Sequence, residues 1–337
     1  MRLTELLLAR PWRLVLVVAL LIALPMLLVG ELSASDTRER IRAAELDALA
    51  TAANRAAASL SDRIETIADQ VEAGSATPPT GRSTPLLRAL EANDAAGLDA
   101  FASYLAAVLG DQVQRVLVLD RAGRVAAAAP TVARPGADYA SRDLFTAVST
   151  ASPRLISNLY LTAAGGGSMG ASGDAPVIGV SSLVTDIHGV RAGVVVTEVD
   201  LHLLGRALTP QLGAADDLYL IDRDGHLLLR ATHAFTPDSA FERDLRGSIA
   251  AQAALSGTSR IEADDPLGGG RRLFGIGSVS ARGWLVLAMR SPAALEAELE
   301  GLLTQGRVAR IALAIVLVLG AALFAQTAGR ARAVRSR

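Results

Sequence analysis

The sequence has no cysteine and no lysine, and only 4% of its 337 residues are aromatic. The absence of cysteine excludes a disulfide framework and a thiolate site, and it is compatible with an exported protein. The formal net charge of -1 gives no electrostatic reason to expect nucleic acid as a partner. The length is sufficient for two ordinary domains.

Two long apolar runs predict membrane spans. They cover Leu14 to Gly30 and Ile311 to Ala328, and each is close to the roughly 20 residues that a helix needs to cross a bilayer. Arginines flank both runs toward the chain ends, which by the positive-inside rule places both termini in the cytoplasm. We therefore expect a multi-pass membrane protein with the lipid bilayer as a partner. Alternatively, the first run is a signal peptide cleaved near residues 33–35.

A long helix is expected directly after the first run. Residues 31–73 contain no proline or glycine, and apolar residues recur at alternating intervals of three and four. At 1.5 Å per residue this helix spans roughly 60 Å. Its apolar stripe either packs against the chain's own domain or contributes to the seam of a homodimer, because near-heptad spacing serves both. The stripe comprises Leu46, Leu49, Ala53, Leu60, Ile64, Ile67 and Val71.

One pattern then occurs twice. LVLDRAGRV at Leu117 to Val125 and YLIDRDGHL at Tyr219 to Leu227 each consist of two apolar runs around Asp-Arg-x-Gly, which predicts a β-hairpin. VIGVSSLV at 177–184 and LFGIGSVS at 273–280 form a second pair, and each leads to a further strand. The first members start 102 residues apart and the second 96 residues apart. We therefore expect one module of about 100 residues to be repeated.

The order of these pieces resembles the double Cache family, tandem PAS-like sensor domains of bacterial transmembrane receptors. Further matching pieces are DYASRDLF (138–145), RLISNLY (154–160) and GWLVLAMRSP (283–292), and the resemblance covers about residues 31–292. It implies an α+β fold, in which a long N-terminal helix precedes two tandem PAS-like lobes with antiparallel sheets, flanked by two transmembrane helices. It also implies a sensor outside the bacterial inner membrane, with a small ligand bound in the membrane-distal lobe.

The resemblance implies a ligand site as well. In family members that bind amino acids, an arginine of a short helix clamps the ligand carboxylate, and Arg142 stands at that position. Tyr160 resembles an aromatic residue of the following strand, and Asp200 resembles the acid that holds the ligand amine. Tyr139 and Phe145 join this set because intervals of three through Arg142 place all three near one face of a helical turn. A guanidinium presents a planar fork to a carboxylate, so the expected ligand is a carboxylate or an amino acid.

The sequence departs from the amino-acid-binding pattern at three positions. Leu144 and Phe145 stand where the family has Trp and Tyr, and Thr162 stands where it has an acid. A carboxylate without an amine tolerates these changes better than a zwitterion does. Structural explanations are open too: Phe145 as a core residue, Arg142 in a surface ion pair, and Asp200 as a helix N-cap.

The other motifs are better explained by structural roles than by catalysis or metal binding. GGGSMG at 165–170 matches two Gly-rich signatures by letter but lacks their strand–turn–helix context, so we expect a flexible loop. The run DRDG at 222–225 lacks the spacing of a calcium loop and is expected to be a turn. The four histidines show no metal-ligand spacing. We expect no catalytic residue, no metal and no cofactor.

The sequence thus predicts the sensing module of a homodimeric receptor, which signals through its membrane helices to an output domain absent from this chain. Two alternatives are open: a structural or dimerisation module that binds a protein partner, and a membrane-tethered exported enzyme. The expected segments are 1–13 and 329–337 in the cytoplasm, 14–30 and 311–328 in the membrane, 31–110 as a helical layer, 111–208 as the membrane-distal lobe, 209–292 as the membrane-proximal lobe, and 293–310 as a connecting helix.

Overall fold

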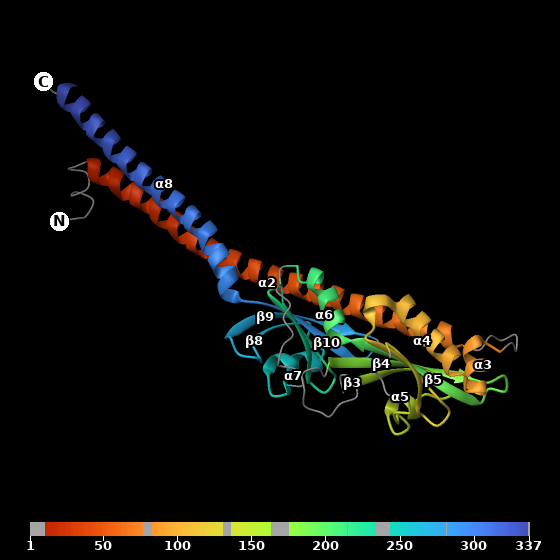
Figure 1. Ribbon diagram of the computed structural model, residues 1–337. Coiled ribbons are helices and arrows are strands. Elements are labelled where there is room, and N and C mark those ends of the chain that lie inside the picture. Colours follow the sequence, from red (N-terminus) through yellow and green to blue (C-terminus); the bar gives the residue numbers. More distant parts are fainter. Residues whose placement is uncertain are drawn as a thin grey trace. The chain divides into compact units, whose positions relative to one another are not determined.

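The computed structural model describes residues 11–335 except 77–82, 131–135, 163–174, 214, 233–242 and 281. Some side chains within helices and strands, including that of Tyr160 and most of those in 11–34, also lie outside the description. The chain forms two compact units (Figure 1). One comprises Met1–Leu46 and Ser291–Arg337, and the other comprises Asp47–Arg290.

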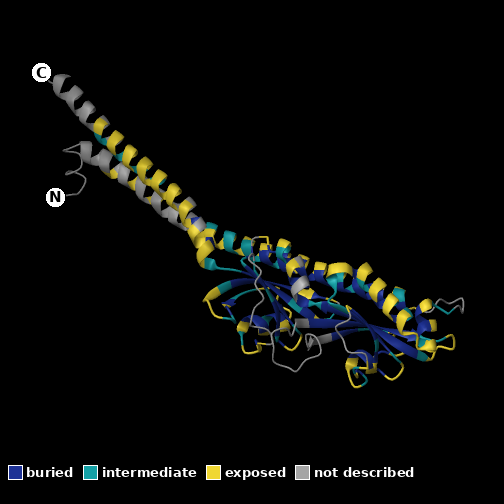
Figure 2. Ribbon diagram, in the orientation of Figure 1, coloured by how far each residue is buried: buried dark blue, intermediate teal, exposed yellow. Residues whose placement is uncertain are grey.

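The first unit consists of long helices. Helix α2 (Pro11–Ser75) begins there and continues into the second unit, and α8 (Pro292–Arg335) covers both the expected connecting helix and the second apolar run. Among the described residues one helical stretch, Pro292–Gly320, is long and apolar enough to cross a membrane, with a mean hydropathy of 1.8. Leu295 and Leu299 near its start are buried, whereas most apolar side chains from Val308 to Leu319 are exposed, as Val316 is at 64% (Figure 2). The first predicted span is helical, and its membrane role stays a prediction.

The apolar stripe of α2 packs within the second unit. Leu49, Ile64, Ile67 and Val71 are fully buried in the single chain, which confirms the own-domain interpretation of the stripe. The contact with strand β9 (Arg271–Val279) is close, because a Cβ added at Gly275 would lie 2.1 Å from the backbone of α2. Two shorter helices follow, α3 (Pro85–Ala92) and α4 (Ala95–Leu109), within the expected helical layer.

The second unit contains two five-stranded antiparallel sheets with the same strand order. The first sheet runs β2-β1-β5-β4-β3 and the second β7-β6-β10-β9-β8, which confirms the internal repeat. We call the first sheet with α5 the first lobe, and the second sheet with α7 the second lobe. The remaining elements are η1 (Gly110–Gln112), β1 (Arg115–Leu119), β2 (Val125–Ala129), α5 (Asp143–Thr146), β3 (Arg154–Thr162), β4 (Ala175–Thr185), β5 (Arg191–Asp200), α6 (Leu201–Leu208), η3 (Thr209–Gln211), β6 (Asp217–Ile221), β7 (Leu227–Thr232), α7 (Ile249–Leu255), β8 (Arg260–Asp264) and β10 (Trp284–Arg290).

The register of the strands differs by one residue from the match of letters between the lobes. The letters align Gly179 with Gly275 and Glu198 with Ala288. In the sheets, however, Glu198 pairs with Arg115 of β1, and Met289 pairs with Asp217 of β6, which lies 102 residues after Arg115 as the repeated hairpins do. Glu198 therefore corresponds to Met289, and their partners on the other side are Gly179 and Phe274. A shift of one residue exchanges the two faces of a strand. Gly275 therefore faces α2, and Phe274 takes the position that Gly179 has in the first lobe.

Candidate functional site

The segment around Arg142 forms a turn followed by a very short helix. Helix α5 begins only at Asp143, and Arg142 precedes it with an extended backbone (φ -83°, ψ 146°). Tyr139 lies earlier still, and its backbone N–H donates to the carbonyl of Gly123, 2.8 Å away. The expectation of one helical face is therefore wrong. The turn nevertheless places the guanidinium of exposed Arg142 over the ring of buried Tyr139, 4.6 Å from its centroid.

Phe145 belongs to the apolar core of the first lobe. It is buried in a cluster with Leu144, Val148 and side chains of β1, β4 and β5. The guanidinium of Arg191 covers its ring at 4.6 Å from the centroid and donates a hydrogen bond to the carbonyl of Val148. These contacts place Phe145 beneath the turn that carries Arg142, as a support for it.

Asp200 and Tyr160 belong to one row of the sheet. Asp200 is the last residue of β5, is half-buried, and lies opposite Val177 of β4. Tyr160 of β3 lies opposite Val177 from the other side. Residues paired across neighbouring strands share one face of the sheet, and two strand spacings separate these two backbones by about 10 Å. The register therefore brings these two predicted residues to the same end of the same sheet face.

The next row carries a buried ion pair that the sequence analysis did not identify. Glu198 of β5 lies between Arg115 of β1 and Gly179 of β4. The Nε and Nη2 atoms of Arg115 lie 2.6 and 2.5 Å from Oε2 of Glu198. The glutamate side chain is fully buried and that of the arginine is 11% exposed. Because charges this deep need a partner, the pair holds β1 and β5 together at this end.

Tyr139 lies close enough to this ion pair for the two charges to affect the pKa of its hydroxyl. Burial, followed by the negative charge of Glu198, raises the pKa of the Tyr139 hydroxyl, while Arg115 and Arg142 act in the opposite direction. The hydroxyl therefore stays protonated at neutral pH and can donate a hydrogen bond. We define the candidate site by six residues: Arg115, Tyr139, Arg142, Gly179, Glu198 and Asp200.

A local signal for Glu198 was present in the sequence. In VVVTEVD, Glu198 precedes Asp200 by two residues and therefore lies on the same strand face, in a run whose only other polar residue is Thr197. A charge at such a position is a reason to look for a buried partner. Its partner Arg115 is 83 residues away in the chain, so no local pattern connects the two.

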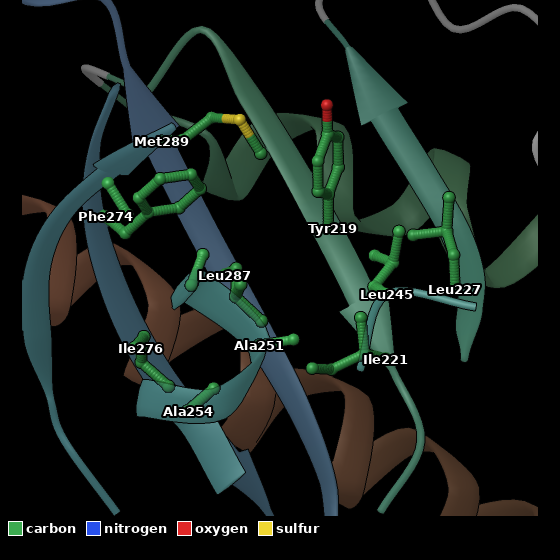
Figure 3. Packing of buried hydrophobic residues seen from close by; sticks show 12 residues of the cluster. Tyr219, Ile221, Leu227, Leu245, Ala251, Ala254, Phe274, Ile276, Leu287 and Met289 are labelled. Carbon is green, nitrogen blue, oxygen red and sulfur yellow. The ribbon is translucent and has the colours of Figure 1, made fainter. Parts of the chain in front are cut away.

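At two positions of the candidate site, the second lobe has large apolar residues in place of a glycine and an acid. Phe274 takes the place of Gly179, and Met289 takes the place of Glu198. Both side chains are fully buried in the apolar cluster of that lobe, together with Tyr219 (Figure 3). The two sheets therefore share their topology but differ in what fills this face.

The hydroxyl of Tyr219 completes a buried polar cluster in the second lobe. It donates to Oδ1 of Asp265 over 3.1 Å, and Arg272 Nε lies 3.6 Å from the other oxygen of the same carboxylate. Burial and then the charge of Asp265 raise the pKa of Tyr219. The aspartate also accepts a hydrogen bond from the Leu267 backbone. The Tyr219 hydroxyl and the Asp265 carboxylate thus have polar partners within the lobe, as expected for a structural polar cluster.

The remaining motifs form no metal centre in the described part of the chain, where no group of three or more metal-ligating side chains occurs. The Asp222 carboxylate accepts backbone hydrogen bonds from Asp224 and His226, which confirms the turn. The Gly-rich run 165–170 and His233 lie outside the described residues, as does the side chain of His202; His188 is in the β4–β5 hairpin turn.

No protein-family profile and no curated protein matches the sequence, whereas solved structures do. The ligand-binding domain of the Pseudomonas fluorescens chemoreceptor CtaA, in complex with L-isoleucine, is similar with a TM-score of 0.54 and 15% identity, over 78% of this chain and 98% of that chain. The corresponding domain of Pseudomonas aeruginosa PctB, in complex with L-Gln, gives 0.53 and 17%, over 80% and 98%. The chain has the double Cache fold. An extracellular domain ascribed to a histidine kinase is similar as well, with 0.54 and 17%, over 78% and 96%, so double Cache domains of different receptor classes share this architecture.

Proposed function

We propose that this chain is the extracytoplasmic sensing part of a transmembrane signal-transduction receptor, and that it binds a small carboxylate or amino acid at the candidate site of the first lobe. The lobe would be the membrane-distal one. Arg142 would hold the ligand carboxylate, and Asp200 would hold an amine where the ligand has one. The double Cache domains of CtaA and PctB were solved with amino acids bound, which supports this ligand class.

The observation that carries the proposal is the difference between the two lobes at equivalent positions. Where Phe274 and Met289 fill the second lobe with hydrocarbon, the first lobe has Gly179, which lacks a side chain, and the charged Glu198. A protein that used both lobes only as scaffold would gain stability from apolar packing in both. A glycine and one member of a buried ion pair at these two positions of the first lobe are expected where a ligand needs space and polar contacts.

The exposure of Arg142 is compatible with both a ligand-binding module and a structural module, so it does not discriminate between them. A structural or dimerisation module also leaves this arginine at the surface, as does a site whose arginine reaches the ligand from the rim. The difference at these two positions favours a ligand, because docking of a protein partner does not require a glycine and a charged residue there in the first lobe. A metal-dependent exported enzyme would need a group of metal-ligating side chains, and the described residues contain none.

Signalling would follow from a difference in ligand affinity between two arrangements of the receptor. A ligand shifts such an equilibrium only by the amount of that difference. In this proposal the chain crosses the bacterial inner membrane through α2 and α8, forms a homodimer, and transmits the shift through both helices to an output module. Helix α2 passes directly from the sensing unit into the first unit, which supplies a continuous connection.

Thermal unfolding of the full chain in detergent, against a panel of organic acids, amino acids and amines, tests the proposal. A ligand at 100 times its Kd should stabilise the protein by about 2.7 kcal/mol. Arg142→Ala should lose a charge-assisted bond worth about 1.5–3 kcal/mol, which weakens binding roughly 10-fold to 150-fold. Arg223→Ala, at the exposed hairpin turn of the second lobe, is the matched control and should bind as the wild type does.

Two results would contradict the proposal. If no compound in the panel changes the melting temperature of the wild type, the small-molecule function is wrong and a protein partner becomes the better explanation. If a ligand stabilises the wild type and Arg142→Ala equally, the ligand is bound, but the clamp is not Arg142.

A further inference from the structure

Ser181 carries a buried hydroxyl for which the described residues provide no hydrogen-bond partner. The residue is completely buried, and its Oγ is unpaired. Buried hydroxyls are nearly always bonded to protein or water, so each exception needs an explanation. The adjacent Ser182 shows the ordinary case. On the opposite face of the strand, its Oγ accepts a hydrogen bond of 2.6 Å from Ser75 of α2.

The unpaired hydroxyl belongs to the face of the candidate site. Ser181 follows Gly179 by two residues on β4, so the two residues share a face at a separation of about 7 Å. Gly179 lies opposite Glu198, and Ser181 lies opposite Val196. The equivalent position in the second lobe is Ile276, which is part of the apolar core. A hydroxyl thus stands where the sister lobe places hydrocarbon.

We propose that Ser181 determines specificity by hydrogen bonding to an uncharged polar group at the tail of the ligand. This inference rests on the proposed function. Four residues of β4 separate Ser181 from the row of Asp200, or about 13 Å. Two hydrogen bonds of about 2.9 Å, one at each end of the ligand, leave about 7 Å between its polar ends. The ligand class is therefore a carboxylate or amino acid with an extended tail that ends in an amide or a hydroxyl.

A charged tail does not fit this end of the site. Glu198 is already paired with Arg115 through two contacts of 2.6 and 2.5 Å, so neither charge is available without breaking the pair. The side chains around Ser181 are apolar, with Val196 opposite and Leu183 two residues farther along the same face. An ionised tail would be buried there without a counter-charge, which is strongly unfavourable.

Isosteric compounds provide the test. L-glutamine, L-glutamate and L-homoleucine have nearly the same shape and differ in the amide, the charge and the hydrocarbon of the tail. For acids without an amine, 6-hydroxyhexanoate and heptanoate form the matching pair. Calorimetric titration of the full chain in detergent should show the amide or hydroxyl compound binding at least about tenfold more tightly than its isosteres. In Ser181→Ala this preference should fall to about one, through weaker binding of the polar compound.

The ligand-free protein gives a second, independent measurement. Ser181→Ala removes a hydroxyl that has no partner, so its melting temperature should equal or exceed that of the wild type. Ser182→Ala removes a bonded hydroxyl of the same strand, and should lower the melting temperature by about 2–4 °C. This pair of variants distinguishes a hydroxyl kept for a ligand from one that supports the fold.

The outcomes separate this inference from the function on which it rests. If some acid or amino acid binds but the polar tails have no advantage, or Ser181→Ala keeps the preference, the role of Ser181 is refuted and the sensing function stands. Equal destabilisation by Ser181→Ala and Ser182→Ala also refutes it. If neither the broad panel nor these compounds bind the wild type, both proposals are wrong.

Discussion

Because Glu198 forms a buried ion pair with Arg115, the stability of the first lobe depends on the charge of the Glu198 carboxylate. Glu198→Gln keeps the shape of a fully buried side chain but removes its charge, and leaves the nearly buried Arg115 without a counter-charge. Removing one partner of a buried pair costs about 3–5 kcal/mol. Since each kcal/mol corresponds to about 2–4 °C in a unit of this size, we expect the melting temperature to fall by at least about 6 °C.

Removing both charges should restore most of this loss. Replacing a buried pair by apolar side chains of similar volume is often neutral, so the double variant Arg115→Met, Glu198→Leu should be more stable than Glu198→Gln alone. Scanning calorimetry of the full chain in detergent measures all variants. The control is Glu262→Gln, whose partner Arg271 is 68% exposed, so that its loss should stay below about 1 kcal/mol.

The reasoning is refuted by either of two results. The first is a Glu198→Gln variant no less stable than Glu262→Gln, which would mean that Arg115 finds water or another partner at no cost. The second is a double variant at least as unstable as Glu198→Gln, which would mean that packing rather than charge sets the stability of this row.

Three further predictions concern α2 and the second lobe. Gly275→Ala should lower the free energy of unfolding by about 3 kcal/mol or more, because the new Cβ would lie 2.1 Å from the backbone of α2. The control is Gly301→Ala in α8, where the new Cβ meets no atom, so this change should be neutral or stabilising by up to about 1 kcal/mol. Calorimetry compares the two variants. Tyr219→Phe should cost about 1–3 kcal/mol through the lost bond to Asp265. Because the folded pKa of Tyr219 is raised, its stabilisation is complete below the unfolded value of about 10 and declines as the pH rises above it; alkaline unfolding should therefore be less steep in the variant. Arg154→Ala breaks partly exposed ion pairs with three acids of α2, so urea unfolding should show a loss of about 1 kcal/mol that shrinks in about 0.5 M salt.

Local sequence patterns were sufficient to predict the helices and hairpins. The apolar stripe of α2 repeats within single turns, and each Asp-Arg-x-Gly turn lies between the two strands that it joins, so a short window contains the information. The helical turn through Arg142 failed for a tertiary reason. Asp138 forms a β-bridge with Arg124, and Tyr139 donates to Gly123, so the hairpin holds this segment out of a helix until Asp143.

The sequence alone determined the long helix, the repeated module and the apolar runs, since each depends on residues close together in the chain. The tertiary structure decided which residues share the candidate site. Side chains of a strand alternate with a period of two, so the same letters place a glycine toward the site or toward α2 depending on a one-residue shift. Pairing across strands fixes that shift: it aligns Gly179 with Glu198, Gly275 with Ala288, and Arg115 with an acid 83 residues away.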